Sequence, residues 1–280
     1  MNHPTLLPLP LAPWQETRDT LHAYSRILGK IRQALSPPQE HWWHASLLPS
    51  EGGLSTGPMP MDNGSSSCSL TLDLDRHAVL IAGQESSQTI LLTGQSVNSL
   101  AGSILGALDV WGVQPAIDLS LFADETPLGY NPDHAQRYNQ ILQRLAEIWR
   151  GFQSELPGKA SPVQLWPHHF DLSLVWFSGS TVPGVDPNDV ENAQEQMAFG
   201  FSTGDEGISD PYIYITAYPF PTGLTATPLP APACWHTSGW QGALIPYNEL
   251  AQRSNAVDRL REILRATQRA GAEIMQTEAS

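Results

Sequence analysis

Two twelve-residue segments that lie 125 positions apart resemble each other, and they constrain the fold of this chain more than any other feature. The segments SPPQEHWWHASL (36–47) and SPVQLWPHHFDL (161–172) are identical at five positions without a gap. The chain's two lysines, Lys30 and Lys159, both follow a glycine shortly before these segments. We therefore predict an internal duplication with a first repeat at 1–125 and a second at 126–280. Since one half alone is a marginal core, the halves should pack as one module about a pseudo-twofold axis.

Four segments carry apolar residues at helical spacing, two in each half. The segment 131–152 is the clearest, because Asn131 and Pro132 form a helix start signal and a wide apolar stripe follows. Ser96 is a suitable N-cap for the second segment, and Gly112 suits its end. The predicted helices cover 14–35, 96–111, 131–152 and 254–272.

Strand-like segments lie between the helices of each half. Alternation is visible in SLTLDL (69–74) and YIYI (212–215). Consecutive strands with short turns imply antiparallel pairing. We therefore predict an α+β protein of two helix–antiparallel sheet–helix repeats. The predicted strands are 41–48, 53–59, 69–74, 78–81 and 89–92 in the first half, and 163–178, 197–202, 211–217 and 242–246 in the second.

The charge and the cysteine content restrict the environment and the partners. The formal net charge is −14, with 14 basic and 28 acidic residues. Such a chain lacks the positive field that nucleic acid or an anionic membrane surface would require. The two cysteines have no metal-finger spacing, no signal peptide is evident, and no apolar run reaches the ~18 residues of a membrane span. We expect a cytoplasmic protein without nucleic-acid or membrane partners, and its oligomeric state stays open.

The repeated segments also carry the candidate site. If both are strands, His44 and His169 occupy equivalent positions and could meet at the axis, with Asp171 one pleat from His169. Two histidines and a carboxylate are a common ligand set for a divalent metal such as iron, zinc or copper. A carboxylate can equally act as a base or orient a histidine. Three further histidines could belong to the first or second shell of such a centre: His41, His168 and His236.

Two other interpretations of the histidines stay open. They could line a metal-free polar or catalytic pocket, or they could be satisfied structural residues beside tryptophans. The chain has no HExxH, GxSxG, GxGxxG or P-loop motif. The loop GFSTGD (200–205) and several aromatic residues could line a ligand site, or they could simply be turn and core.

The combined motifs resemble an uncharacterised bacterial family of unknown function. They are HWWHASL (41–47), SPVQLWPHHFDLSLVWFSG (161–179), GFSTGD (200–205), PYIYITAYPFP (211–221) and GALIPY (242–247). The resemblance covers nearly the whole chain and implies no established activity, substrate or cofactor. It also implies that positions 168 and 169 are not histidine in other members, which favours His44 and Asp171.

We expect the protein to bind a small molecule in a pocket between or beside two sheets. A sharper version is a metal-dependent enzyme with a centre at His44, His169 and Asp171. The alternative is a non-catalytic binding or protein-interaction module whose histidines are structural.

Overall fold

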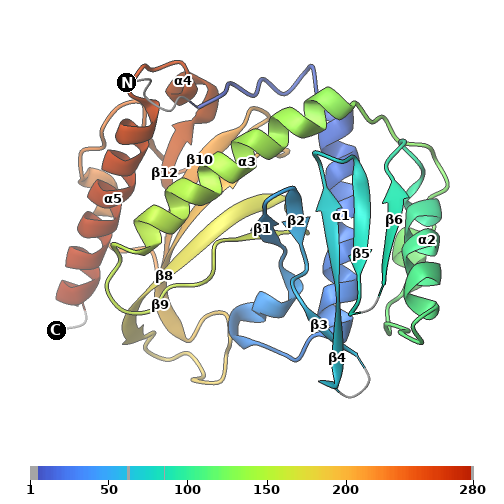
Figure 1. Ribbon diagram of the computed structural model, residues 1–280. Coiled ribbons are helices and arrows are strands. Elements are labelled where there is room, and N and C mark those ends of the chain that lie inside the picture. Colours follow the sequence, from blue (N-terminus) through green and yellow to red (C-terminus); the bar gives the residue numbers. More distant parts are fainter. Residues whose placement is uncertain (1–5, 62–63, 85, 279–280) are drawn as a thin grey trace. The chain divides into compact units, whose positions relative to one another are not determined.

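The computed structural model describes residues 6–61, 64–84 and 86–278, and it divides the chain into two compact units (Figure 1). Unit 1 contains the described residues up to Leu11, the segment Arg144–Val163 and the chain from Asp171 onward. Unit 2 contains Ala12–Gln143 and Gln164–Phe170. Both units combine helices with antiparallel sheet, so the predicted α+β class is confirmed.

Unit 2 is an antiparallel sheet with two helices against it. In Figure 1, α1 runs along the sheet and α2 lies beside β6. The strands pair in the order β1-β2-β4-β5-β6, with β3 also on β4. The elements of unit 2 are α1 (Gln15–Leu35), η1 (Glu40–Ala45), β1 (Leu48–Ser50), β2 (Gly53–Ser55), β3 (Met59–Met61), β4 (Ser66–Asp73), β5 (Ala78–Ala82), β6 (Ser87–Leu91), α2 (Val97–Asp109), η3 (Leu119–Phe122), the first half of α3 (Pro132–Gln153) and β7 (Gln164–Trp166).

The helices of unit 2 form where the apolar spacing predicts them. On α1, Leu21, Tyr24, Leu28 and Ile31 make one buried face. Ser96 caps α2, because its hydroxyl accepts a hydrogen bond from the Ser99 N–H at 3.2 Å. The predicted helices 14–35 and 96–111 are therefore confirmed.

Unit 1 is a second antiparallel sheet, in the order β8-β9-β10-β12-β11, with α5 along β9 and β10. The predicted helix at 131–152 is confirmed as α3, whose second half belongs to this unit. The predicted helix at 254–272 is also confirmed, although it is longer. The remaining elements are β8 (Asp171–Thr181), β9 (Gln194–Ser202), β10 (Tyr212–Tyr218), η4 (Leu224–Ala226), β11 (Cys234–His236), β12 (Gly242–Pro246), α4 (Tyr247–Ala251) and α5 (Ala256–Glu278).

The two faces of the unit 1 sheet differ in chemistry. Strand alternation and the register place Leu174, Phe199 and Ile215 on one face, and all three are buried. Helix α3 packs on this face, where the Trp149 Nε1–H donates to the Phe199 carbonyl at 2.6 Å. The opposite face carries polar residues in matching register, and it positions the candidate site described below.

The predicted strand at 41–48 is wrong. Residues 40–45 form the short 3-10 segment η1, in which His41 and Trp42 have φ of 51° and 58°. This left-handed conformation cannot continue a β-ladder. The strand begins only at Leu48.

The predicted strand at 163–178 is wrong in its middle. Residues 167–170 form a turn between β7 and β8, and Phe170 has a φ of 58°. His168 and His169 lie in this turn, so strand alternation no longer places His169 and Asp171 on one face.

The helices within the described ranges are all too short or too polar to cross a membrane. The chain repeats the order helix, strands, helix in its two halves, as expected. The duplication itself, with repeats at 1–125 and 126–280, stays a prediction.

Candidate functional site

His44 is a buried residue at the end of η1 in unit 2. Only 4% of its surface is exposed. Its Nδ1 accepts a hydrogen bond from the Gln39 backbone N–H at 3.1 Å, which assigns the proton of the neutral ring to Nε2. Burial, and then the positive charge of Arg32, lower the pKa of His44. At neutral pH His44 is therefore an uncharged ring with one N–H donor.

His168 and His169 lie together in the exposed turn after β7. Their rings are 4.3 Å apart, and Nε2 of His22 on α1 lies 3.2 Å from the His168 carbonyl oxygen. Partial burial lowers the pKa of His168 to about 4, and the neighbouring His169 and His22 act in the same direction. Three imidazoles therefore gather here, two from the turn and that of His22 from α1. His44 has no such histidine neighbours among the contacts given above.

The other predicted site residues are dispersed. His41 lies beside Trp43 in η1, and their ring centroids are 5.6 Å apart. Asp171 and His236 belong to unit 1, so the structure does not test a centre that joins Asp171 to His44 and His169. Across the residues that the structure describes, no three His, Cys, Asp or Glu side chains gather as a metal site.

Asp171 instead pairs with a tyrosine across the sheet of unit 1. Asp171 is the first residue of β8, Tyr214 lies on β10, and β9 runs between them. The Tyr214 hydroxyl nevertheless donates a hydrogen bond to Asp171 Oδ2. The ring passes over Gly200 of β9, where an added Cβ would lie 2.1 Å from the Tyr214 Cζ atom. The pairing is therefore possible only because position 200 has no side chain.

A second pair of the same kind lies beside the first. The Tyr212 hydroxyl donates to Asp205 Oδ2, and the Tyr212 and Tyr214 ring centroids are 6.3 Å apart. Trp240 stacks on Tyr212 at 6.2 Å, and His236 lies 4.4 Å from Trp240. We call this region the tyrosine–carboxylate face; its members are Asp171, Ser173, Ser202, Asp205, Tyr212, Tyr214, His236 and Trp240.

Burial and the neighbouring carboxylates determine the protonation of both tyrosines. Burial and the negative charge of Asp171 raise the pKa of Tyr214 well above 10. Burial and hydrogen bonding to Asp205 likewise raise the pKa of Tyr212. Both hydroxyls therefore stay protonated at neutral pH. They can donate hydrogen bonds, or act as weak acids, but they cannot act as bases.

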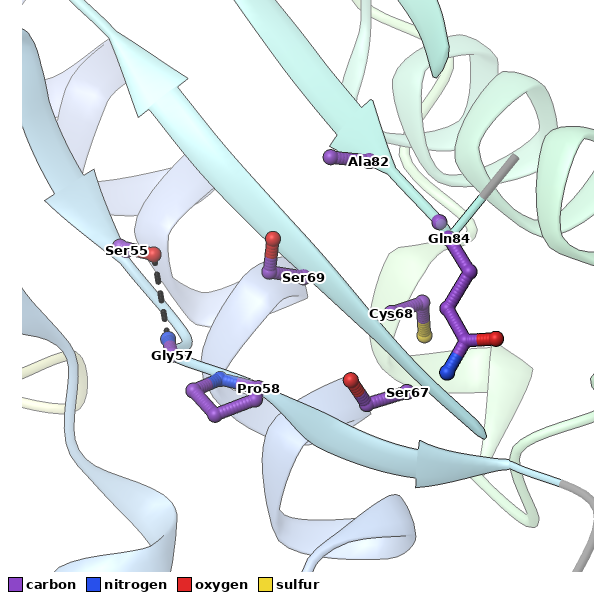
Figure 2. Close-up of a pocket in the computed structure, with 9 residues that line it drawn as sticks. Ser55, Gly57, Pro58, Ser67, Cys68, Ser69, Ala82 and Gln84 are labelled. Atoms are coloured by element: carbon purple, nitrogen blue, oxygen red, sulfur yellow. Dashed lines mark hydrogen bonds between the residues drawn. The ribbon is translucent and has the colours of Figure 1, made fainter. Parts of the chain in front are cut away.

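Unit 2 carries hollows elsewhere. One of about 360 Å³ lies between β2, β4 and β5, and serine side chains line much of it (Figure 2). Within it Ser55 Oγ accepts the Gly57 N–H at 3.1 Å. Another hollow, of about 690 Å³, lies near the starts of α1 and α3. The predicted site residues line neither of these two hollows.

In the sequence, Asp171 is a candidate metal ligand or base, and its partner Tyr214 is not among the predicted site residues. The GFSTGD loop and the aromatic residues were noted only as possible pocket walls. The alternation in YIYI contains the signal, because it places Tyr212 and Tyr214 on one face. Without the strand register, nothing connects that face to Asp171 and Gly200.

Comparisons with known proteins identify the family of this chain but no activity. The model of one protein family, described as a family of unknown function, matches residues 6–280. No curated protein and no solved structure matches the chain significantly.

Proposed function

Because this chain belongs to DUF5996, a family of unknown function, we propose from its geometry that it binds a small polar molecule at the tyrosine–carboxylate face of unit 1. One observation carries the proposal. Tyr214 reaches across β9 to Asp171, and Gly200 provides the space for its ring.

A purely structural role explains this arrangement poorly. Polar groups removed from water lower stability unless they are paired. Apolar side chains would cover a sheet face at a smaller desolvation cost. Asp171 and Ser202 are nevertheless buried here, 7% and 6% exposed, while Tyr214 and His236 keep part of their surface accessible. A preformed set of hydrogen-bonding groups beside accessible aromatic rings is typical of a small-molecule site.

The chemistry of the face indicates the kind of ligand. Each tyrosine hydroxyl donates to a carboxylate and accepts from a serine, Ser202 at Tyr212 and Ser173 at Tyr214, which leaves one lone pair for a ligand. The half-buried Trp240 ring, which stacks on the buried Tyr212 ring, provides an aromatic surface. A neutral molecule with hydroxyl or amino groups and one flat or apolar side fits these groups.

Thermal unfolding in the presence of a library of polar metabolites tests the proposal. We expect at least one compound to raise the melting temperature, and Tyr214→Phe and Asp171→Asn to remove that rise. Tyr130→Phe is the matched control, because it removes a tyrosine hydroxyl from unit 2 that contacts His77 at 3.0 Å. The proposal fails if no compound binds, or if binding survives in both unit 1 variants.

The metal-dependent version of the function is a separate proposal with its own test. A centre at His44, His169 and Asp171 requires near-stoichiometric iron, zinc or copper in protein purified without a histidine tag. It also requires loss of that metal in His44→Ala and His169→Ala. Metal-free protein whose melting temperature does not change on chelation would contradict it. If metabolite binding also fails, the interaction-module alternative is favoured.

We also infer that the two halves of the chain, 1–125 and 126–280, derive from one ancestral helix–sheet–helix unit. Each has an antiparallel sheet, and the two halves of the chain repeat the same order of elements. The matching segments at 36–47 and 161–172 support this inference. The test is an experimental structure: residues 1–125 and 126–280 should superpose strand by strand, and a failure to superpose would contradict the duplication.

A further inference from the structure

Arg32, in the last turn of α1, is a buried cation in unit 2. Only 8% of its surface is exposed. Its Nη1 donates to the Ser46 carbonyl and, at 3.3 Å, to the Ser46 Oγ. A guanidinium has five N–H donors, so these bonds use only part of its capacity.

No carboxylate balances this charge within the part of the chain that the structure describes. An unpaired buried charge is costly, and proteins usually pair such groups or give them an ion to bind. The negative end of the α1 dipole offsets the charge only in part, because it corresponds to roughly half an elementary charge.

A second unsatisfied donor lies beside Arg32. Gln164 is fully buried, and its Oε1 lies 2.7 Å from the same Ser46 Oγ. Its Nε2 has no hydrogen-bond partner among the described residues. Both side chains therefore contact Ser46 Oγ. The Gln164 amide N–H₂ has no acceptor, and the Arg32 guanidinium beside it has no counter-charge.

A third buried donor belongs to the same segment, because His44 precedes Ser46 by two residues. Its neutral tautomer keeps the proton on Nε2, because Nδ1 accepts the Gln39 N–H. Burial, and then the charge of Arg32, lower the pKa of His44, so the ring stays neutral. The Gln164 amide has no acceptor and Arg32 has no carboxylate partner among the described residues, and an anion would supply both.

We propose that Arg32, Gln164 and His44 form a binding site for a small oxyanion, a carboxylate or phosphate group, beside Ser46 in unit 2. The guanidinium offers a planar edge that pairs with two oxygens of such a group. The amide and the imidazole N–H would donate to the remaining lone pairs. The small accessible surface of Arg32 suits a compact group rather than a polymer. This site is independent of the tyrosine–carboxylate face.

The decisive variant is Gln164→Glu. It replaces the amide by a carboxylate of nearly the same shape and so supplies the missing negative charge internally. We expect this variant to melt higher than the wild type in chloride buffer and to gain nothing from added anions. The wild type should gain roughly 2–4 °C from inorganic phosphate, from acetate, or from both, at constant ionic strength.

Arg26→Met is the matched control, because it removes an exposed arginine from the same helix. Phosphate stabilises many proteins through general exclusion from their surface. The informative quantity is therefore the rise in melting temperature when the anion is added. This rise should be larger in the wild type and in Arg26→Met than in Gln164→Glu and Arg32→Met. A gain with phosphate alone assigns a phosphate group, and a gain with acetate assigns a carboxylate.

A second measurement needs no substitution. In the wild type, the Arg32 Nε–Hε resonance should shift and saturate as inorganic phosphate or acetate is titrated. An unchanged resonance with both anions, or an equal thermal gain in all four proteins, would overturn the oxyanion site. Neither result bears on ligand binding at unit 1, which has its own variants.

Discussion

Gly200 is the residue on which the tyrosine–carboxylate face depends. Its missing side chain lets the Tyr214 ring cross β9. We expect Gly200→Ala to lower the free energy of unfolding by about 1–3 kcal/mol, because the new methyl group forces the ring away and breaks the bond to Asp171. Urea denaturation measures the loss.

Gly102 provides the matched control. It lies exposed on α2, and nothing lies within 4 Å of an added Cβ there. Gly102→Ala should stabilise the protein by up to ~1 kcal/mol, because alanine favours helix. Equal effects at both positions would show that the Tyr214 ring does not need the space over Gly200.

His44 gives a prediction about pH. Because burial and Arg32 lower its folded-state pKa, the unfolded chain binds a proton at this ring more readily. The contribution of neutral His44 to the free energy of unfolding is complete above about pH 6.5, the ordinary histidine pKa. It is lost as the pH falls from there through the lowered pKa. The free energy of unfolding should therefore fall between pH 7.5 and 5.

His44→Asn should flatten that decline, since the asparagine oxygen can still accept the Gln39 N–H but does not titrate. Urea unfolding at several pH values measures the slope. Some decline should remain, because His22 and His168 also have lowered pKa values. Identical slopes in the two proteins would contradict the prediction.

At the scale of elements, periodic segments were predictable and turns were not. The four long helices follow from apolar spacing and from the caps at Ser96 and Asn131. The segments around His44 and His169 were misassigned, because a left-handed residue such as His41 or Phe170 leaves no signature in composition. Since the proposed metal centre assumed strands at both places, its geometry could not be predicted from the sequence.

The contact between α3 and β9 gives a prediction for this scale. Trp149 is fully buried, and its indole N–H donates to the Phe199 carbonyl. Trp149→Phe should cost about 1–3 kcal/mol, because the carbonyl loses its partner inside the core. Trp111→Phe is the control, since the Trp111 indole bonds Ser86 at an exposed site, and its loss should stay within about 0.5 kcal/mol. Urea denaturation measures the free energy of unfolding of both variants. Similar losses would argue against a special role for the buried hydrogen bond.

At the scale of the whole molecule, the compact units do not follow the contiguous halves. Unit 2 takes the start of α3 and the segment 164–170 from the second half. There, the Trp14 and Tyr138 rings stack at 5.2 Å, and Leu47 and Leu165 exchange backbone hydrogen bonds. Sequence similarity between two segments could not reveal this exchange, because similarity gives no information about contacts.

A chain divided after residue 125 tests this composition. The fragment 1–125 should not give a dispersed amide spectrum alone, because it lacks the partners of Trp14 and Leu47. Co-expression with 126–280 should restore the spectrum. A fragment 1–125 that folds alone would show that these contacts are dispensable.

The distribution of each unit along the chain has a consequence for biosynthesis. Unit 2 has all its segments once Phe170 has left the ribosome. Unit 1 needs Leu9, whose N–H donates to Asn248 at 2.6 Å, and it also needs α5. Leu9 must therefore wait until Asn248 and α5 have been made. During translation, unit 2 can mature early, while the nascent sheet of unit 1 stays exposed until α5 has been made.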